Sequence, residues 1–150
     1  MNDVTDSSAY NAEVAAGAAK FTGTRWTTYI SELVYDDVYD VTICPDGSKW
    51  FTTTKGVSKF DNTEWTTYNE ENGMPEENCR SIAVDDRGVV WVGTLGGGLC
   101  KLQGAAWQQY TVANSYLVNN YVWAIGLDPT SLKFWFGTNG GVSLYQISEQ

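Results

Sequence analysis

The sequence predicts an all-β fold built from internal repeats, and three observations support this. Aromatic residues make up 14% of the 150 residues, with seven Trp and nine Tyr, and such residues favour strands. Fifteen Gly against three Pro fit many short strands joined by tight turns. A tryptophan pattern also recurs at nearly constant spacing, as expected for a repeat architecture.

Two tryptophan motifs set the period of the repeat. The first reads Trp-x-x-Tyr, with copies starting 39 and 42 residues apart, and the second is a Trp whose copies lie 41 and 44 residues apart. The copies are Trp26–Tyr29, Trp65–Tyr68 and Trp107–Tyr110 for the first motif, and Trp50, Trp91 and Trp135 for the second. A period of about 40–45 residues with four strands in each unit is typical of a β-propeller blade.

Each unit is expected to hold four strands, called A to D in chain order. The first unit is predicted to place them at 38–43, 48–53, 56–60 and 65–68, and the second at 79–84, 89–94, 98–102 and 107–110. The third unit supplies A to C at 122–127, 133–138 and 141–146 but no D, whereas 26–29 is a strand D ahead of the first unit. Gly and Asp at 45–47 and 85–88 suit the A-to-B hairpin turns.

Residues 1–20 are predicted as an N-terminal arm or degenerate strand, partly disordered through about residue 12, and 21–150 as the three propeller repeats. Gly17 corresponds to Gly98 at the start of a strand C, so 14–21 is a candidate for a degenerate strand of that type. The six repeated tryptophans are expected to pack inside or between blades. Cys44, Cys79 and Cys100 are expected to be buried free thiols, which favours a reducing compartment.

The second unit resembles the two-component regulator propeller repeat. The matching residues are Met74–Cys79, Ile82, Asp85, Gly88, Trp91–Thr94 and Gly98-Leu99, and the third unit repeats the pattern at Trp135–Thr138 and Gly141-Val142. In that family such repeats build ligand-sensing propellers outside the cell that are joined to a histidine kinase. The resemblance implies a sensor-type β-propeller and allows an extracytoplasmic location.

Three blades fall short of the roughly 4–8 that close a propeller. The strand at 26–29 is a suitable strand D for the sheet at 122–146, so a second chain would allow closure. We expect a homodimer with a six-bladed ring, in which each N-terminal strand D completes the partner's last blade. A trimeric ring and a piece of a longer propeller are the alternatives.

Charge and composition exclude several functions. Eighteen acidic against nine basic residues give a net charge of −9, which argues against nucleic acid or membrane partners. The chain has no His, which excludes Ser-His-Asp and Cys-His catalysis and His-liganded zinc. Neither a signal peptide nor an apolar run of about 18 residues is recognised, so a soluble cytoplasmic protein is expected.

Candidate binding residues lie on strand A and in the loops before it. Tyr39, Arg80 and Trp123 share one strand position near the central channel, where aromatic rings and a guanidinium suit a planar or sugar-like anionic ligand. A water-filled channel without a ligand is the alternative. The loops add polar groups at one rim: Asp36, Asp37, Glu76, Glu77, Asn78, Asn119, Asn120 and Tyr121. Calcium is only weakly indicated there, because no calcium-loop motif is present.

These features predict a noncatalytic binding module for a small, carbohydrate-like ligand or a protein at the channel mouth and loop rim. No catalytic residue and no cofactor are expected. The alternatives are a lyase or glycosidase that uses rim carboxylates and a purely structural oligomerisation scaffold. Lyases with a propeller fold rely on His, so the absence of His from this chain favours a binding function over catalysis.

Overall fold

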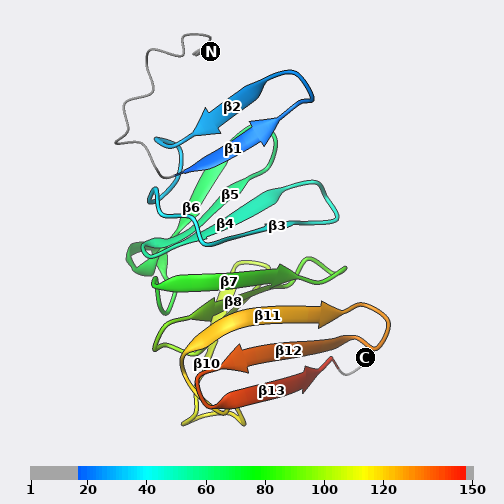
Figure 1. Ribbon diagram of the computed structural model, residues 1–150. Coiled ribbons are helices and arrows are strands. Elements are labelled where there is room, and N and C mark those ends of the chain that lie inside the picture. Colours follow the sequence, from blue (N-terminus) through cyan, green and yellow to red (C-terminus); the bar gives the residue numbers. More distant parts are fainter. Residues whose placement is uncertain (1–16, 148–150) are drawn as a thin grey trace.

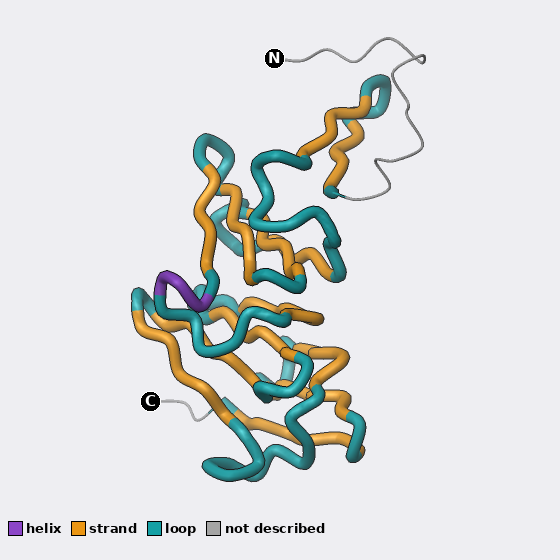
Figure 2. The backbone as a smooth tube through the Cα atoms, turned by 90° about the vertical axis from the view of Figure 1, so that its left-hand side faces the viewer, coloured by secondary structure: helices purple, strands orange, loops and turns teal. Residues whose placement is uncertain are grey.

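The computed structural model describes residues 17–147 and shows four antiparallel sheets that follow one another along the molecule (Figures 1 and 2). A hairpin of β1 (Ala18–Phe21) and β2 (Trp26–Tyr29) comes first. Two four-stranded sheets follow: β3 (Asp40–Ile43), β4 (Lys49–Thr53), β5 (Gly56–Phe60) and β6 (Trp65–Tyr68), then β7 (Cys79–Val84), β8 (Val90–Thr94), β9 (Leu99–Gln103) and β10 (Ala106–Tyr110). The last sheet has β11 (Val122–Asp128), β12 (Lys133–Thr138) and β13 (Gly141–Gln146). A short 3-10 helix, η2 (Glu70–Asn72), lies between β6 and β7.

The strands in each sheet are ordered as they occur in the chain, so every sheet is an up-and-down meander. The prediction of an all-β fold with four-stranded units is confirmed, and the third unit ends at strand C within the described residues. The first strand A begins at Asp40, two residues later than predicted, although the Tyr39 amide still donates to the Thr52 carbonyl.

The strand at 26–29 does not stand alone, because β1 pairs with it from Ala18↔Tyr29 to Phe21↔Trp26. The first full blade joins its strands C and D in the same way, from Val57↔Tyr68 to Phe60↔Trp65. Thus β1 occupies a strand C position. The segment expected to be disordered, up to about residue 12, lies outside the described residues.

Two apolar cores lie between neighbouring sheets. The first joins β3–β6 to β7–β10 around Trp50, and the second joins β7–β10 to β11–β13 around Trp91, which is 2% exposed. Each of these tryptophans stacks on the strand D tyrosine of its own blade, with ring centroids 5.2 Å apart for Trp50–Tyr68 and 5.6 Å apart for Trp91–Tyr110. The strand B tryptophan is therefore covered on one side by its own blade and on the other by the next.

The prediction that all six repeated tryptophans are packed is wrong for two of them. Trp26 is 64% exposed and Trp135 is 47% exposed, whereas Trp50 and Trp91 are buried and Trp65 and Trp107 half-buried. The reason is position: Trp26 lies in the first sheet and Trp135 in the last, where a neighbouring sheet is missing on one side of the described chain.

All three cysteines are free and buried, as predicted. Burial raises the pKa of the Cys100 thiol to about 12. Burial also raises the pKa of Cys79 well above its usual value, and the neighbouring Cys100 adds to that effect. Both side chains lie in the first core and act there as small apolar groups.

Replacing Gly98 should destabilise the fold more than replacing Gly88. The two glycines have nearly equal left-handed φ angles, 78° and 77°, so alanine brings similar backbone strain of about 1 kcal/mol at each. A Cβ on Gly98 would lie 2.1 Å from the Tyr110 carbonyl oxygen, whereas one on Gly88 would meet nothing. We expect G98A to cost a further ~1–3 kcal/mol in urea unfolding. Equal costs would contradict the close approach of strands C and D.

Stability should fall in alkaline solution through the buried thiols. Because their folded pKa is raised, their contribution is complete below the unfolded thiol pKa of about 8.5 and is lost as pH rises toward about 12. We expect Cys100→Ala to lose unfolding free energy less steeply than the parent chain between these pH values. A chemical-denaturation series over that window measures the slope, and identical slopes would contradict the pKa assignment.

Candidate functional site

The three strand A side chains singled out in the sequence lie together. The Arg80 guanidinium carbon stands 3.8 Å from the centroid of the Tyr39 ring and 5.3 Å from that of the Trp123 ring. Each residue comes from a different blade, and the three occupy equivalent positions of strand A, so the repeat brings them into one cluster. Tyr39 and Trp123 are exposed and Arg80 is half-buried. The cluster is therefore a cation between two aromatic faces at the surface.

Two of these residues project from irregular points of their strands. The pairing of β7 with β8 shifts between Cys79 and Ser81, and that of β11 with β12 shifts between Val122 and Ala124. Arg80 and Trp123 are the skipped residues. A bulge redirects the side chain of the extra residue and often lies beside a binding site. Neither shift is visible in the repeat pattern, because the inserted residue is present in every unit.

Residues that the sequence analysis did not single out hold the cluster in place. The Asp40 carboxylate accepts a hydrogen bond from the Ile82 amide at 3.0 Å and so joins strand A of one blade to strand A of the next. The Thr52 hydroxyl lies 3.5 Å from both the Asp40 and the Arg80 carbonyl oxygens. The Trp123 indole N–H donates to the Asn139 side-chain oxygen. The only sequence signal for Asn139 is its place in a turn between strands B and C.

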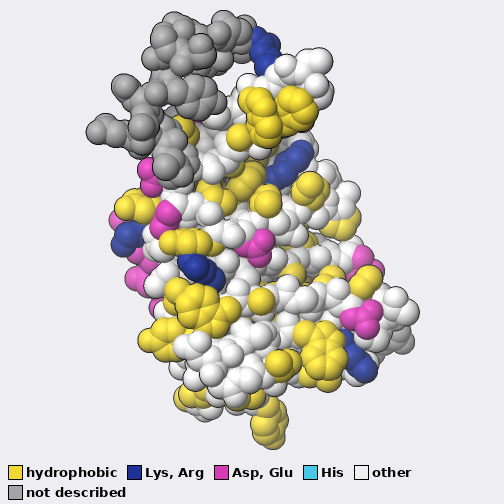
Figure 3. All heavy atoms as spheres, in the orientation of Figure 1, with side chains coloured by type: hydrophobic (Ala, Val, Ile, Leu, Met, Phe, Trp, Pro, Cys, Tyr) yellow, Lys and Arg dark blue, Asp and Glu magenta, His cyan; other side chains and the backbone are white. Residues whose placement is uncertain are grey.

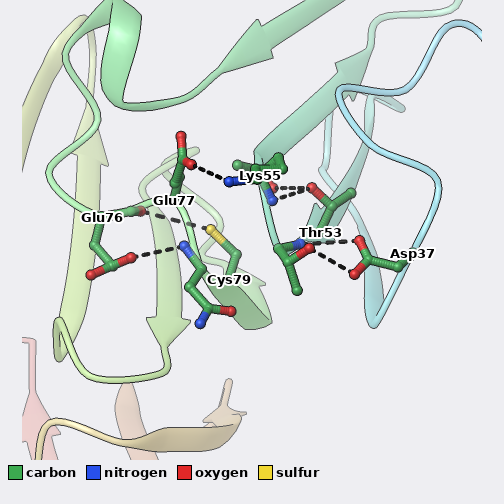
Figure 4. A network of polar contacts seen from close by, with 9 residues as sticks. Asp37, Thr53, Lys55, Glu76, Glu77 and Cys79 are labelled. Carbon is green, nitrogen blue, oxygen red and sulfur yellow. Dashed lines mark hydrogen bonds and ion pairs between the residues drawn. The ribbon is translucent and has the colours of Figure 1, made fainter.

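The rim loops are held by hydrogen bonds to the blades on either side of them rather than forming a separate cluster. The Gly56 amide donates to the Glu77 carbonyl at 2.7 Å, and at the next junction the Gly98 amide donates to the Asn120 carbonyl at 2.9 Å. The Glu77 carboxylate pairs with the Lys55 ammonium at 3.1 Å. Figure 4 shows this pair and the Asp37 carboxylate, which accepts from the amide and hydroxyl of Thr54.

Most of the remaining rim residues make local hydrogen bonds, and two are exposed. Glu76 accepts from the Asn78 amide at 2.9 Å, and its side chain covers Gly97. Asn119 accepts from the Tyr121 amide, and the Asn120 side chain accepts from the Val112 amide. Asp36 and the Tyr121 ring are exposed. Among the described residues, no group of three or more acidic or Cys side chains is arranged to hold a metal ion.

Arg80 forms no ion pair with another residue of 17–147, whereas Lys55 pairs with Glu77 and Arg87 with Asp85. The space-filling view shows basic side chains set among hydrophobic ones across the sheets (Figure 3). The cluster thus offers a positive group with aromatic surfaces beside it.

Comparison with known proteins agrees with the repeat and the fold. Residues 73–96 match the family described as the two component regulator propeller. No curated protein matches the chain. None of the described residues forms a helix of the length and apolarity needed to cross a membrane.

Solved structures with the same fold come from several proteins. The extracellular domain of BT3049, a hybrid two component system of B. thetaiotaomicron, aligns over 84% of this chain and 18% of its own, with a TM-score of 0.72 and 22% identity. PorZ of Porphyromonas gingivalis aligns over 83% and 20%, at TM-score 0.66 and 21% identity. Virginiamycin B lyase of Staphylococcus aureus aligns over 86% and 48%, at TM-score 0.66 and 18% identity. These likenesses establish a β-propeller fold, and this chain spans less than half of each of these proteins.

Within the site, replacing Asp40 should lower stability more than replacing Arg80. Asp40→Ala leaves the buried Ile82 amide without its acceptor, which should cost about 1–3 kcal/mol of unfolding free energy. Arg80→Ala removes cation–π contacts at a partly exposed site and should cost about 0.5–1 kcal/mol. Urea unfolding of both variants measures the difference. A larger loss for Arg80→Ala would make the cluster structural.

Proposed function

We propose that this chain is a noncatalytic binding module of a sensor-type β-propeller and that it binds an anionic, sugar-like ligand at Tyr39, Arg80 and Trp123. The observation that carries the proposal is the Arg80 guanidinium, which lies between two aromatic rings without an ion pair among the described residues. A guanidinium presents a planar fork of N–H donors to a carboxylate, and aromatic faces pack against sugar rings.

The charge distribution is compatible with recognition at this cluster. With a net charge of −9, the chain as a whole repels anions, so attraction of an anionic ligand depends on local basic groups, and Arg80 is one that forms no ion pair among the described residues. Arg80 is half-buried beside the two rings, and this partial removal from water strengthens the hydrogen bonds of its guanidinium to an incoming carboxylate.

The surrounding carboxylates support binding rather than catalysis. Acid–base hydrolysis of a sugar bond needs two carboxyl groups free to act on opposite sides of the ligand. Here Asp37 accepts from Thr54, Glu76 accepts from the Asn78 amide, and Glu77 pairs with Lys55. The lyase and glycosidase alternative would have to release these contacts before either group could act.

Calorimetric titration with an oligogalacturonate, which carries a carboxylate on each sugar, tests the proposal. We expect binding that neutral malto-oligosaccharides of equal length do not show, and a loss of about tenfold or more in affinity for both Arg80→Ala and Trp123→Ala. Lys101→Ala is the matched control, because its ammonium lies 5.4 Å from the Trp91 ring in another part of the blade. Binding that is indifferent to Arg80→Ala, or no preference for the acidic sugar, would contradict the proposal.

A further inference from the structure

Two sheets present uncovered apolar faces. On the last sheet, of β11 to β13, Trp135, Val142 and Leu144 are exposed, with Val142 at 62%. On the first four-stranded sheet, next to the N-terminal hairpin, Val41 and Ile43 are exposed on β3, and Ile43 reaches 67%. Figure 3 shows hydrophobic side chains on the surface of the last sheet. The strand order also leaves the outer edge of β13 unpaired within the described residues.

The internal junctions show what normally covers these positions. Val41 corresponds to Ile82, which is buried in the same core as Trp50 of the preceding blade. Trp135 corresponds to Trp50 and Trp91, each of which stacks on a strand D tyrosine. The exposed groups on these two sheets are therefore the two halves of one blade-to-blade junction, and the chain is complementary to itself.

The last blade lacks the contacts that a strand D would supply. A Cβ on Gly56 or Gly98 would lie 2.1 Å from the carbonyl oxygen of the strand D tyrosine, whereas one on Gly141 meets nothing within 4 Å. A cavity of about 280 Å³, lined mainly by aromatic and aliphatic side chains, also opens beside β13; its lining includes Trp91, Tyr110, Leu144 and Tyr145. At the first junction, the strand D tyrosine of one blade has the next strand D tryptophan beside it, with Tyr68 and Trp107 5.9 Å apart. Tyr110 has no such tryptophan in the described chain.

The N-terminal hairpin carries the missing strand D. Trp26 and Tyr29 occupy the same positions in β2 as Trp65 and Tyr68 in β6, and Trp26 is largely exposed. The strand that now pairs with β2 is β1, whose sequence is Ala-Ala-Lys-Phe and whose last three residues are exposed. By contrast β13 is longer, buries Ser143 and contacts Trp91 through Tyr145, with ring centroids 5.0 Å apart.

We propose that β13 of one copy replaces β1 against β2 of a second copy, with Val142↔Tyr29, Ser143↔Thr28, Leu144↔Thr27 and Tyr145↔Trp26 as the pairs. This register is the one that β5 and β6 already use. Trp26 then enters the cavity beside Tyr110, and Tyr29 lies over Gly141. The partner's Trp135 face covers Val41 and Ile43. Two such exchanges, one in each direction, close a ring of two copies. Twelve strands of each copy then lie in blades, and β1 is the strand that is displaced.

Pairs of introduced cysteines distinguish pairing of β2 with β1 of its own chain from pairing of β2 with β13 of a second copy. Directly opposed Cβ atoms in an antiparallel pair lie about 4.5–5.5 Å apart, close enough for a disulfide to form with small adjustments. We expect Leu144→Cys with Thr27→Cys to give a covalent dimer under mild oxidation on a non-reducing gel. We expect Lys20→Cys with Thr27→Cys to form a bond within one chain, to hold β1 in place and to keep the protein monomeric. The single variants are controls, since the native cysteines are buried.

Several results would overturn the proposal. One is that the Leu144→Cys, Thr27→Cys variant forms no more covalent dimer than the single variants. Another is that the amount of dimer does not fall when a disulfide bonds β1 to β2. A third is that the gel shows a ladder of three or more linked copies.

A second pair of variants separates an effect on dimerisation from an effect on folding. Gly141→Ala should weaken dimerisation about tenfold or more because the partner's Tyr29 carbonyl would meet the new methyl group. Gly73→Ala has comparable backbone strain and open surroundings away from this edge, and should leave dimerisation unchanged.

Discussion

The structure depends on the packing of each strand B tryptophan against the blade that follows it. A four-stranded sheet has two faces and cannot cover both by itself, so the rings of Trp50 and Trp91 are removed from water only where another sheet is adjacent. The strand D tyrosine of the same blade completes the enclosure by stacking on the tryptophan. A repeat of this kind is stable mainly through its neighbours.

This packing also places the candidate site. Adjacent blades bring strand A of each beside strand A of the next, and the bond from the Ile82 amide to Asp40 sets how closely they approach. Arg80 and Trp123 lie at bulges of their strands, and the Arg80 guanidinium lies over the rings of both Tyr39 and Trp123. The site residues therefore contribute little to the cores, while the residues that position them, such as Asp40 and the buried Thr52, are structural.

Sequence repeats predict the strands, their order and the burial of Trp50 and Trp91, because these follow from a period that repeats in register. They also predict that Tyr39, Arg80 and Trp123 share one strand position. The correspondence of Gly17 with Gly98 also marks 14–21 as a degenerate strand C, although β1 has two alanines where other blades have larger or polar residues. Two other features could not be found in this way, because the exposure of Trp135 depends on a missing neighbour and the bulges do not change the pattern.

The central claim is that the uncovered faces of the first four-stranded sheet and the last sheet are halves of one junction. Light scattering from the chain at micromolar concentration measures this most directly, because a closed pair has a defined mass. The account predicts a species of twice the 16.6 kDa chain mass that persists on dilution through the micromolar range. A single mass of 16.6 kDa at every concentration would contradict it.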